Sequence, residues 1–410
     1  MKIHFNLNNK GAYKNIFINL IYDNNEYIFR TPLKIDLAQW DIEKQRPKNI
    51  YTKTHKQINN KINALKIELT GYIEQKNKHK NTISHKTIAN IIRKTCKDNK
   101  ENFDQDTLLS FIYSYINKKK SSICNSTYKR YNVFLNLIKR FEGFIMKRLT
   151  ISEIDAYFME RFIAYGKDEA YSENTIYRTI HFIKTILNFI ERKGIRTAVR
   201  ELDIKREKQK KEMISLDEKE ISQIKSTQVP MDLQPAKDWL IISCYTGQRF
   251  SDFIMFSNHK LIEIGGKKCI RFVQQKTQKE ITLPLHPEVV SIIHKNQNQF
   301  PEYINMNRYN ESIKIISKLA GMTQTVRVRR RIDHKYQAAS LEKWETISSH
   351  IGRRSFATNF YGKIPTPLLM EATGHSTEKI FLQYINPVNE ERVNRLSYYF
   401  NKTHRERLNI

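Results

Sequence analysis

The sequence has few cysteines, and none of them is paired. Cys96, Cys124, Cys244 and Cys269 stand singly, without a Cys-x-x-Cys pair and without histidines at the spacing of a zinc module. Scattered cysteines of this kind are typical of proteins in a reducing cytoplasm. We therefore expect a cytoplasmic protein with no structural metal.

Long apolar runs are also missing. The longest candidates, such as Trp239 to Tyr245, fall well short of the roughly twenty residues that a membrane span needs. The first residues, Met1 to Phe5, lack the apolar stretch and the small-residue cleavage site of a secretory signal. We expect a soluble protein that is neither exported nor bound to a membrane.

Acidic residues are in deficit. Asp and Glu total 42 against 71 Lys and Arg, which gives a formal charge of +29. This charge exceeds what solubility requires and favours a polyanionic partner. Nucleic acid is the leading candidate, and an anionic membrane surface comes second.

The length of 410 residues predicts roughly two to four compact domains. Alternating apolar residues in short runs between residues 2 and 35 predict a small antiparallel sheet, and a helix is expected from about Gln57 to Ile73. These elements make up an N-terminal domain, residues 1–102. We predict a fold that is mainly α with small β-sheets (α+β).

From about Asp106 the apolar period changes to 3.6 residues, and four amphipathic helices with basic outer faces are expected. The fourth has the clearest bounds, because Ser172 is placed to cap its start and Gly194 to end it. These helices predict a bundle domain, residues 103–202. Residues 203–213 are almost devoid of apolar side chains and are predicted to be a basic linker.

The third domain, residues 214–410, is predicted to contain helices and one pair of strands. Ser215 and Glu218 have the spacing of a capping box and are expected to open a helix. The remainder is expected to be mostly helical, interrupted by a very basic run. The other predicted features are a helix over Pro235–Tyr245 that ends at Gly247, strands over Lys268–Gln274 and Glu280–Leu285, and the basic run over Thr325–Arg331.

Two arginines and a histidine of this domain are placed for phosphate chemistry. Arg249 follows a helix stop, with Asp252 three residues later to orient it, although Arg–Asp neighbours are usually surface pairs worth little. His350 and Arg353 lie on one face of a helix, and Gly352 between them permits close approach to a phosphate. The simpler interpretation is a basic helix that contacts the DNA backbone.

Three further residues are weak candidates when each is taken alone. His375 lies upstream of Tyr384, but a tyrosine is more often a core or interface aromatic than a nucleophile. Lys276 lies in the turn between the two strands, where lysines are normally solvated. Together, however, the set supplies what metal-free cleavage of a phosphodiester requires: a nucleophile, cations on the non-bridging oxygens, and proton donors and acceptors.

In this order, the set resembles the signature of the tyrosine recombinases, the lambda-integrase-like or phage integrase family. The catalytic-domain resemblance covers about residues 213 to 400. Upstream, residues 106–200 resemble the core-binding domain of the family, and residues 1–100 resemble the arm-binding domain of integrases from phages and conjugative elements. The segments that carry the resemblance are Thr246–Asp252, Gln275–Leu285, Ser349–Thr358, Thr373–Thr377 and, near the N-terminus, Leu37–Trp40.

The resemblance implies a role for each candidate. Tyr384 attacks the phosphodiester to form a 3′-phosphotyrosyl link, and Arg249 and Arg353 stabilise the charged transition state. His350 acts as acid and base, and Lys276 protonates the leaving 5′ oxygen. The supporting residues are His375, which hydrogen-bonds the phosphate, and Asp252, which holds Arg249.

The sequence departs from the family at two of these segments and offers rivals at two positions. Gly352 stands where Leu or Ala is common, and Thr373 replaces a common Leu; neither removes a reacting group. Lys279 is a rival for Lys276 in the same turn. Tyr398 and Tyr399 are rival hydroxyls at a different spacing from His375.

The resemblance further implies an integrase that inserts and excises a mobile element without cofactor or metal, as a homotetramer on double-stranded DNA with core and arm sites. Accessory DNA-bending or excision factors and association with the nucleoid are compatible with it. The alternatives are a chromosome-dimer or inversion recombinase, a type IB topoisomerase, and a DNA-binding protein without catalysis. The resemblance also implies a terminal helix that docks on a neighbouring protomer through an apolar stripe, and the alternative is that this stripe packs within its own chain. The stripe consists of Val393, Leu396, Tyr399 and Phe400.

Overall fold

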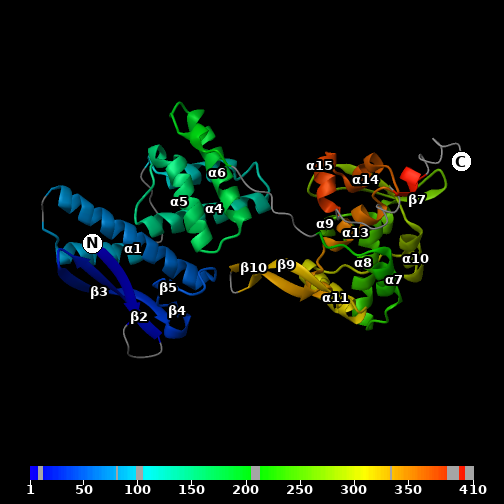
Figure 1. The fold of residues 1–410 in the computed structure, drawn as a ribbon, viewed down its shortest axis with the longest axis horizontal. Helices are drawn as coiled ribbons and strands as arrows, with labels where there is room; N and C mark the ends of the chain where they lie inside the picture. Colours follow the sequence, from blue (N-terminus) through cyan, green and yellow to red (C-terminus); the bar gives the residue numbers. More distant parts are fainter. Residues whose placement is uncertain are drawn as a thin grey trace. The chain divides into compact units, whose positions relative to one another are not determined.

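The computed structural model describes residues 1–7, 13–79, 82–97, 105–204, 213–332, 335–385 and 397–401. The chain divides into two compact units, residues 1–207 and 208–410 (Figure 1). Both units combine helices with small antiparallel sheets, which confirms the predicted fold class. Within the described ranges, no helix combines the length and the apolar character needed to cross a membrane.

The first unit begins with an antiparallel sheet of strand order β1-β2-β3, as predicted. Apolar residues at alternate positions, such as Phe5 and Ile18, are buried against the helix α1, which contributes Leu65. A short helix, α2, was not predicted, although it places Ile88 and Ile92 in the core and packs Ile91 against them. The elements are β1 (Lys2–Leu7), β2 (Tyr13–Tyr22), β3 (Asn25–Asp36), η1 (Leu37–Gln39), β4 (Trp40–Asp41), β5 (Arg46–Pro47), α1 (Lys53–Lys78) and α2 (His85–Lys97).

The four amphipathic helices follow in the same unit and are confirmed. Side-chain caps fix the starts of α3, α5 and α6; at α6, for example, Ser172 accepts a hydrogen bond from the Thr175 amide. Their apolar stripes meet in one core that includes Ile112, Phe141 and Ile183. The elements are α3 (Leu108–Lys119), α4 (Asn125–Ile145), η2 (Ile151–Glu153), α5 (Ala156–Asp168), α6 (Glu173–Glu191) and η3 (Val199–Glu201).

The sheet module and the helical module of this unit pack directly against each other. A Cβ atom on Gly143 of α4 would lie 2.5 Å from Cβ of Asn63 on α1, so the two helices touch. Glu169, at the end of α5, forms ion pairs with Lys44, at 2.8 Å, and with Arg46. Burial acts to raise the pKa of Glu169, but the two cations outweigh it and hold the pKa below its ordinary value. The carboxylate therefore stays charged between the modules.

The second unit is built around α8, which ends at Gly247 as predicted. The preceding helix α7 is capped by Asp217, whose carboxylate accepts from the Glu220 amide, so the predicted Ser215–Glu218 capping box was two residues too early. A third strand, β6, joins the predicted pair in the order β6-β7-β8. The elements to this point are α7 (Glu218–Ser226), η4 (Met231–Leu233), α8 (Gln234–Thr246), α9 (Phe250–Phe253), η5 (Asn258–Lys260), β6 (Leu261–Ile264), β7 (Lys267–Val273) and β8 (Glu280–Pro284).

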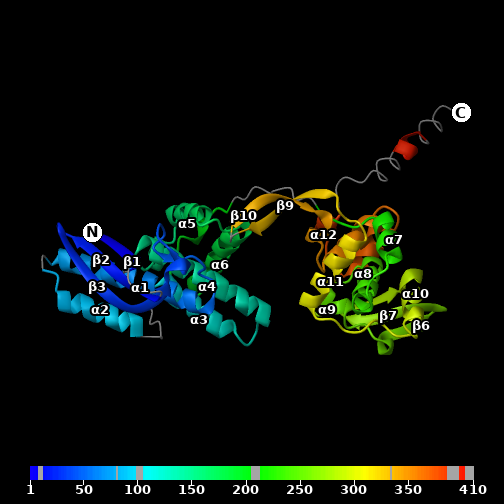
Figure 2. The ribbon, with the colours of Figure 1, turned by 90° about the horizontal axis from the view of Figure 1, so that it is seen from below.

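The basic run that we expected to interrupt a mostly helical region is a strand of a hairpin. The strand β9 (Thr325–Ile332) pairs antiparallel with β10 (Lys335–Glu342), and the ribbon projects from the helices of its own unit (Figure 2). Val326 and Val328 alternate with arginines, a period that favours a strand. The remaining elements are α10 (Pro287–Lys295), α11 (Met306–Leu319), α12 (Lys343–Thr346), α13 (Ile351–Phe360), α14 (Thr366–Thr373), α15 (Glu378–Phe381) and η6 (Leu382–Tyr384).

Candidate active site

Arg249 is positioned by the end of α8. Gly247 ends this helix in the left-handed conformation, with φ +66°, and a Cβ atom there would lie 2.5 Å from Cδ1 of Phe356 on α13. Glycine is therefore required both for the backbone conformation and for the close packing of the loop on α13. Arg249 follows two residues later, at the start of α9, and its side chain is 14% exposed.

The helices α8 and α13 are in close contact at Gly352. A Cβ atom on Gly352 would overlap the hydroxyl of Ser243 and lie 2.7 Å from the carbonyl carbon of that residue. Our expectation that Gly352 leaves room for a phosphate was therefore wrong: it leaves room for α8. The contact fixes α13, which carries Arg353, against the helix that leads to Arg249.

Arg353 is fully buried, and the backbone holds its guanidinium in place. Nη1 donates to the Gly247 carbonyl at 3.0 Å, and Nη2 donates to the Thr373 carbonyl at 2.8 Å and to Nε2 of His375 at 2.8 Å. Burial and the charge of Arg249 lower the pKa of Arg353 to about 10, while Tyr384 and Asp252 act in the opposite direction. Arg353 remains a cation at neutral pH, with its plane set by three partners.

The contacts of His375 fix its tautomer. Because an arginine only donates hydrogen bonds, Nε2 of His375 is the acceptor from Arg353, and the ring is neutral with its proton on Nδ1. That Nδ1–H donates to the Thr373 hydroxyl at 2.7 Å, which itself donates to the Leu369 carbonyl. Burial and the charges of Arg353, Arg249 and Lys279 lower the pKa of His375 to about 3, in agreement with a neutral ring. The family departure at Thr373 thus supplies the acceptor for His375.

Tyr384 lies beside these two residues. Its ring centroid is 5.4 Å from Cζ of Arg353 and 5.0 Å from the ring centroid of His375. It ends the turn η6, which is anchored by the buried neighbours Phe381 and Ile385. A partly buried phenol therefore faces a buried arginine.

His350 marks the start of α13 and remains accessible to solvent. Desolvation of its ring, followed by the charges of Arg354, Arg353, Arg249 and Lys276, lowers its pKa below the ordinary value. The imidazole is therefore neutral at pH 7 and able to accept a proton.

The β7–β8 hairpin is attached to the same site. Asp252 accepts a hydrogen bond from the Gln275 amide at 2.9 Å, and its other oxygen lies 3.9 Å from Nη1 of Arg249. Lys276 and Lys279 are both exposed in the turn, and the charge of Lys276 acts on His350 whereas that of Lys279 acts on His375. The hairpin thus brings two lysines to the site.

Two glutamines were missed by sequence reasoning. Gln248 and Gln274 are both fully buried, and Nε2 of Gln274 donates to Oε1 of Gln248 at 3.0 Å. A signal was present, because Gln274 continues the alternation of Ile270 and Phe272 and so occupies a core-facing position of the strand. A polar residue at such a position requires partners inside the protein.

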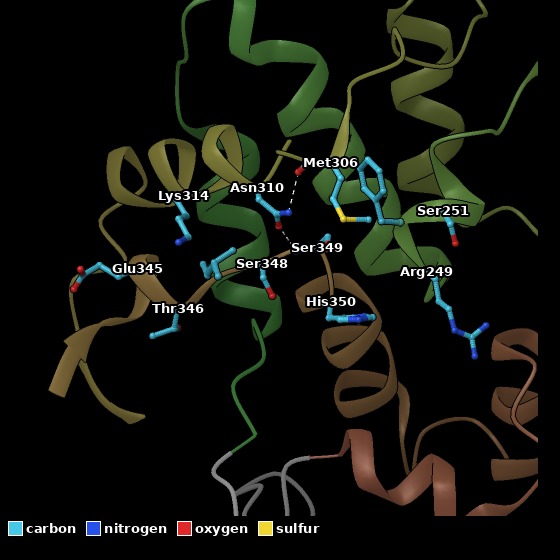
Figure 3. A pocket seen from close by; sticks show the side chains of 12 residues that line it. Arg249, Ser251, Met306, Asn310, Lys314, Glu345, Thr346, Ser348, Ser349 and His350 are labelled. Atoms are coloured by element: carbon cyan, nitrogen blue, oxygen red, sulfur yellow. Dashed lines mark hydrogen bonds between the residues drawn. The ribbon is translucent and has the colours of Figure 1, made fainter. Parts of the chain in front are cut away.

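A pocket of about 500 Å³ adjoins the site. Figure 3 shows Arg249 and Ser251 toward one side and Lys314 and Glu345 toward the other. At its floor, Asn310 accepts a hydrogen bond from the Ser349 amide at 2.8 Å and thereby ties α11 to the turn before His350. The hydroxyl groups of the pocket lie on the residues Ser251, Thr346, Ser348 and Ser349.

The C-terminal candidates are only partly described. Val393 and Leu396 of the predicted apolar stripe lie outside the described residues. Tyr399 and Phe400 are 49% and 63% exposed, and Tyr399 packs edge-on against Tyr398. Across the described ranges, no group of three or more His, Cys, Asp or Glu is arranged to hold a metal ion.

Sequence comparisons match most of the second unit and much of the first to known domains. Residues 206–391 match the model of the phage integrase family, and residues 107–208 match the model of the phage integrase SAM-like domain. No curated protein matches the chain.

Solved structures share the fold at low sequence identity. The XerH site-specific recombinase, bound to its palindromic difH substrate in a post-cleavage complex, is 15% identical, covering 74% of this chain and 98% of that chain with a TM-score of 0.55. The Tn1549 transposon integrase, in complex with transposon right end DNA, is 15% identical, covering 74% of this chain and 100% of that chain with a TM-score of 0.52.

Proposed function

This chain belongs to the phage integrase family of tyrosine recombinases, which cleave and rejoin DNA at specific sites, and we propose that it integrates and excises a mobile genetic element. We further propose that Tyr384 is its nucleophile. The observation that carries the residue assignment is the contact of Tyr384 with Arg353 and His375.

In the proposed cleavage step, Oη of Tyr384 attacks the scissile phosphorus, and the bond from phosphorus to the 5′ oxygen breaks. The phosphate oxygens gain charge in the transition state, and the cations Arg249 and Arg353 stabilise it there. Because Arg353 is already oriented by two carbonyls and His375, it needs no reorganisation as the charge develops. His375 supports the phosphate through Arg353, by fixing its Nη2.

Two proton transfers accompany this exchange of bonds. The imidazole of His350 accepts the phenolic proton of Tyr384, and its lowered pKa keeps the ring unprotonated before this step. Lys276 gives a proton to the departing 5′ oxygen. In the reverse direction a 5′ hydroxyl attacks the phosphotyrosine and gives its proton to Lys276, while His350 returns a proton to the leaving oxygen of Tyr384. The energy of the broken bond is conserved and no cofactor is consumed.

The module arrangement supports the integrase role over a minimal recombinase. The three-stranded sheet with α1 and α2 precedes both matched domains and supplies a further module for binding DNA at arm sites. The Tn1549 transposon integrase, which shares the fold, is described with transposon end DNA. We propose double-stranded DNA as the substrate and a homotetramer as the assembly that exchanges strands between two sites, with the terminal segment docking between protomers.

Covalent trapping tests the proposal. Wild type and Tyr384→Phe are incubated with labelled, nicked DNA that carries the end of the element, and the products are separated on a denaturing gel. We expect a protein-linked band from wild type alone. Tyr398→Phe and Tyr399→Phe are matched controls that remove the rival hydroxyls and are expected to retain the band.

The other outcomes distinguish the rival functions. No band from either protein, on DNA that both bind, would favour a DNA-binding role without catalysis. A band from Tyr384→Phe would move the nucleophile to another tyrosine. A wild-type band formed by a monomer that never pairs two sites would favour a topoisomerase.

A further inference from the structure

We propose that Gln274 and Gln248 form a positioning pair, which aligns Arg249 and the loop that carries His375 for DNA cleavage. This inference rests on the proposed function, because it assigns a task within the same reaction. Neither glutamine reacts, and both are fully buried at the junction of the elements that carry the site.

Every hydrogen-bonding group of the Gln274 amide is used. Its Nε2 donates to Oε1 of Gln248 at 3.0 Å and to the Thr373 carbonyl at 3.1 Å. Its Oε1 accepts from Nη1 of Arg249 at 3.1 Å and from the Thr277 hydroxyl at 2.6 Å. A buried amide with four partners has one orientation only.

Gln248 completes the pair in the same way. Its Nε2 donates to the carbonyls of Thr246 and Ala372, at 2.8 Å and 2.7 Å, and its Oε1 accepts from Gln274. The partners fix both amide orientations, because Arg249 only donates and a carbonyl only accepts. Exchanging the oxygen and nitrogen of either amide would therefore break these hydrogen bonds.

The pair connects three segments that are distant in sequence. Gln248 follows α8, Gln274 follows β7, and the carbonyls of Ala372 and Thr373 end α14. Gly374 is closely packed on the pair, because a Cβ atom there would overlap Oε1 of Gln274 and lie 2.8 Å from its Cδ. One amide thus contacts the first arginine, the lysine-bearing turn and the loop of His375.

The hydrogen bond from Arg249 to Gln274 sets the orientation of the Arg249 guanidinium group. Its Nη1 is held by Gln274, and the carboxylate of Asp252 lies further away, at 3.9 Å. Gln274 is neutral, so it orients the guanidinium without competing with the phosphate for its charge. An acidic residue at the same place would hold Arg249 more tightly and oppose its transfer to the phosphate.

The experiment separates cleavage from binding in the full-length protein. Single-turnover formation of the covalent adduct is measured at saturating nicked DNA, and DNA affinity is measured separately, for wild type, Gln274→Met and Gln248→Met. Methionine keeps the length of the side chain and removes its hydrogen bonds. We expect unchanged affinity and a cleavage rate that falls on the order of 100-fold for Gln274→Met, the effect of a misplaced catalytic group.

The matched control is Gln234→Met. Gln234 also donates an amide hydrogen bond, to Asp238 at 2.8 Å, but it begins α8, about 18 Å along the helix from Thr246. Its cleavage rate is expected to equal that of wild type. A second readout is the combination with Arg249→Lys: if Gln274 acts through Arg249, the double variant is no slower than the slower single variant.

Each outcome decides the proposal. A Gln274→Met protein that cleaves within twofold of wild type overturns it, as does full additivity of the rate losses of Gln274→Met and Arg249→Lys. Loss of folding in both glutamine variants would make the pair purely structural and also overturn it; if only one variant fails to fold, the other decides. Failure of wild type to form any adduct would instead refute the proposed function.

Discussion

Gly374 offers a test of how tightly the site is packed. Its φ of +71° is matched by Gly266, in the turn between β6 and β7, where φ is also +71°. A Cβ atom at Gly266 would meet nothing within 4 Å, whereas at Gly374 it would overlap the amide of Gln274. Alanine therefore adopts the same unfavourable φ at both positions. The two variants differ in that only the Cβ atom at position 374 overlaps the amide of Gln274.

The magnitudes follow from these two contributions. The left-handed conformation costs alanine about 1–2 kcal/mol at either position. At Gly374 the displaced Gln274 amide also leaves buried partners unsatisfied, which adds about 1–3 kcal/mol. We expect Gly374→Ala to lose roughly twice as much stability as Gly266→Ala, and to slow cleavage because Arg249 loses its partner.

Unfolding followed by tryptophan fluorescence measures this difference, since Trp239 and Trp344 both belong to the second unit. Adduct formation on nicked DNA supplies the second readout. Equal losses of stability for the two variants, together with equal cleavage rates, would refute the packing of Gly374 on Gln274.

Four further predictions follow from the structure. Arg353→Lys is expected to lower the cleavage rate by roughly 100-fold or more in the adduct assay, because lysine cannot reproduce the fork held by Gly247 and Thr373; a near-normal rate would contradict the role of Arg353. The pKa of His375 is about 3 in the folded protein, below its ordinary value, so the folded state binds fewer protons, and the free energy of unfolding is expected to fall as pH drops from about 6.5 toward 3. In His375→Gln that slope, followed by denaturant titration at each pH, should be smaller; an identical slope argues against a neutral His375. Glu169→Gln is expected to cost the first unit about 1–3 kcal/mol, because two cations lose their shared anion, and an unchanged unfolding midpoint by circular dichroism would count against it. Affinity for random duplex DNA, measured by fluorescence anisotropy, should fall about 1,000-fold or more between 50 and 200 mM salt, and a flat response would exclude the electrostatic contribution.

Much of the fold was predictable because its signals are local. The alternation of Ile3, Phe5 and Leu7 specifies a strand, and the period of 3.6 in the four helices specifies a bundle, without knowledge of distant residues. The same period was present in α2, where Ile88, Ile91 and Ile92 fall at i, i+3 and i+4, but it was missed. The hairpin β9–β10 is formed by pairing between strands, which no single strand reveals.

The site divides in the same way. The proposed reacting groups were predicted from their types and order, since Arg249, His350, Arg353 and Tyr384 resemble a known signature. Their support was not, because the carbonyl of Thr373, which accepts from both Arg353 and Gln274, lies at the end of α14, twenty residues or more from either in the sequence. Backbone acceptors carry no sequence signature, so the arrangement that orients the cations becomes visible only when the chain is folded.

The ion pairs of Glu169 with Lys44 and Arg46 have a consequence for how the first unit engages a long polymer. The sheet module and the helical module are joined by packed side chains, and not only by the intervening chain, so their separation is a fixed length. When the helical module contacts a polymer, the sheet module stays within a small volume around that contact. The effective concentration of the sheet module at neighbouring sites on the same polymer is therefore high. If both modules bind DNA, as we propose, the first unit is expected to bind jointly two sites spaced to this fixed length, and sites at other spacings are expected to compete for it.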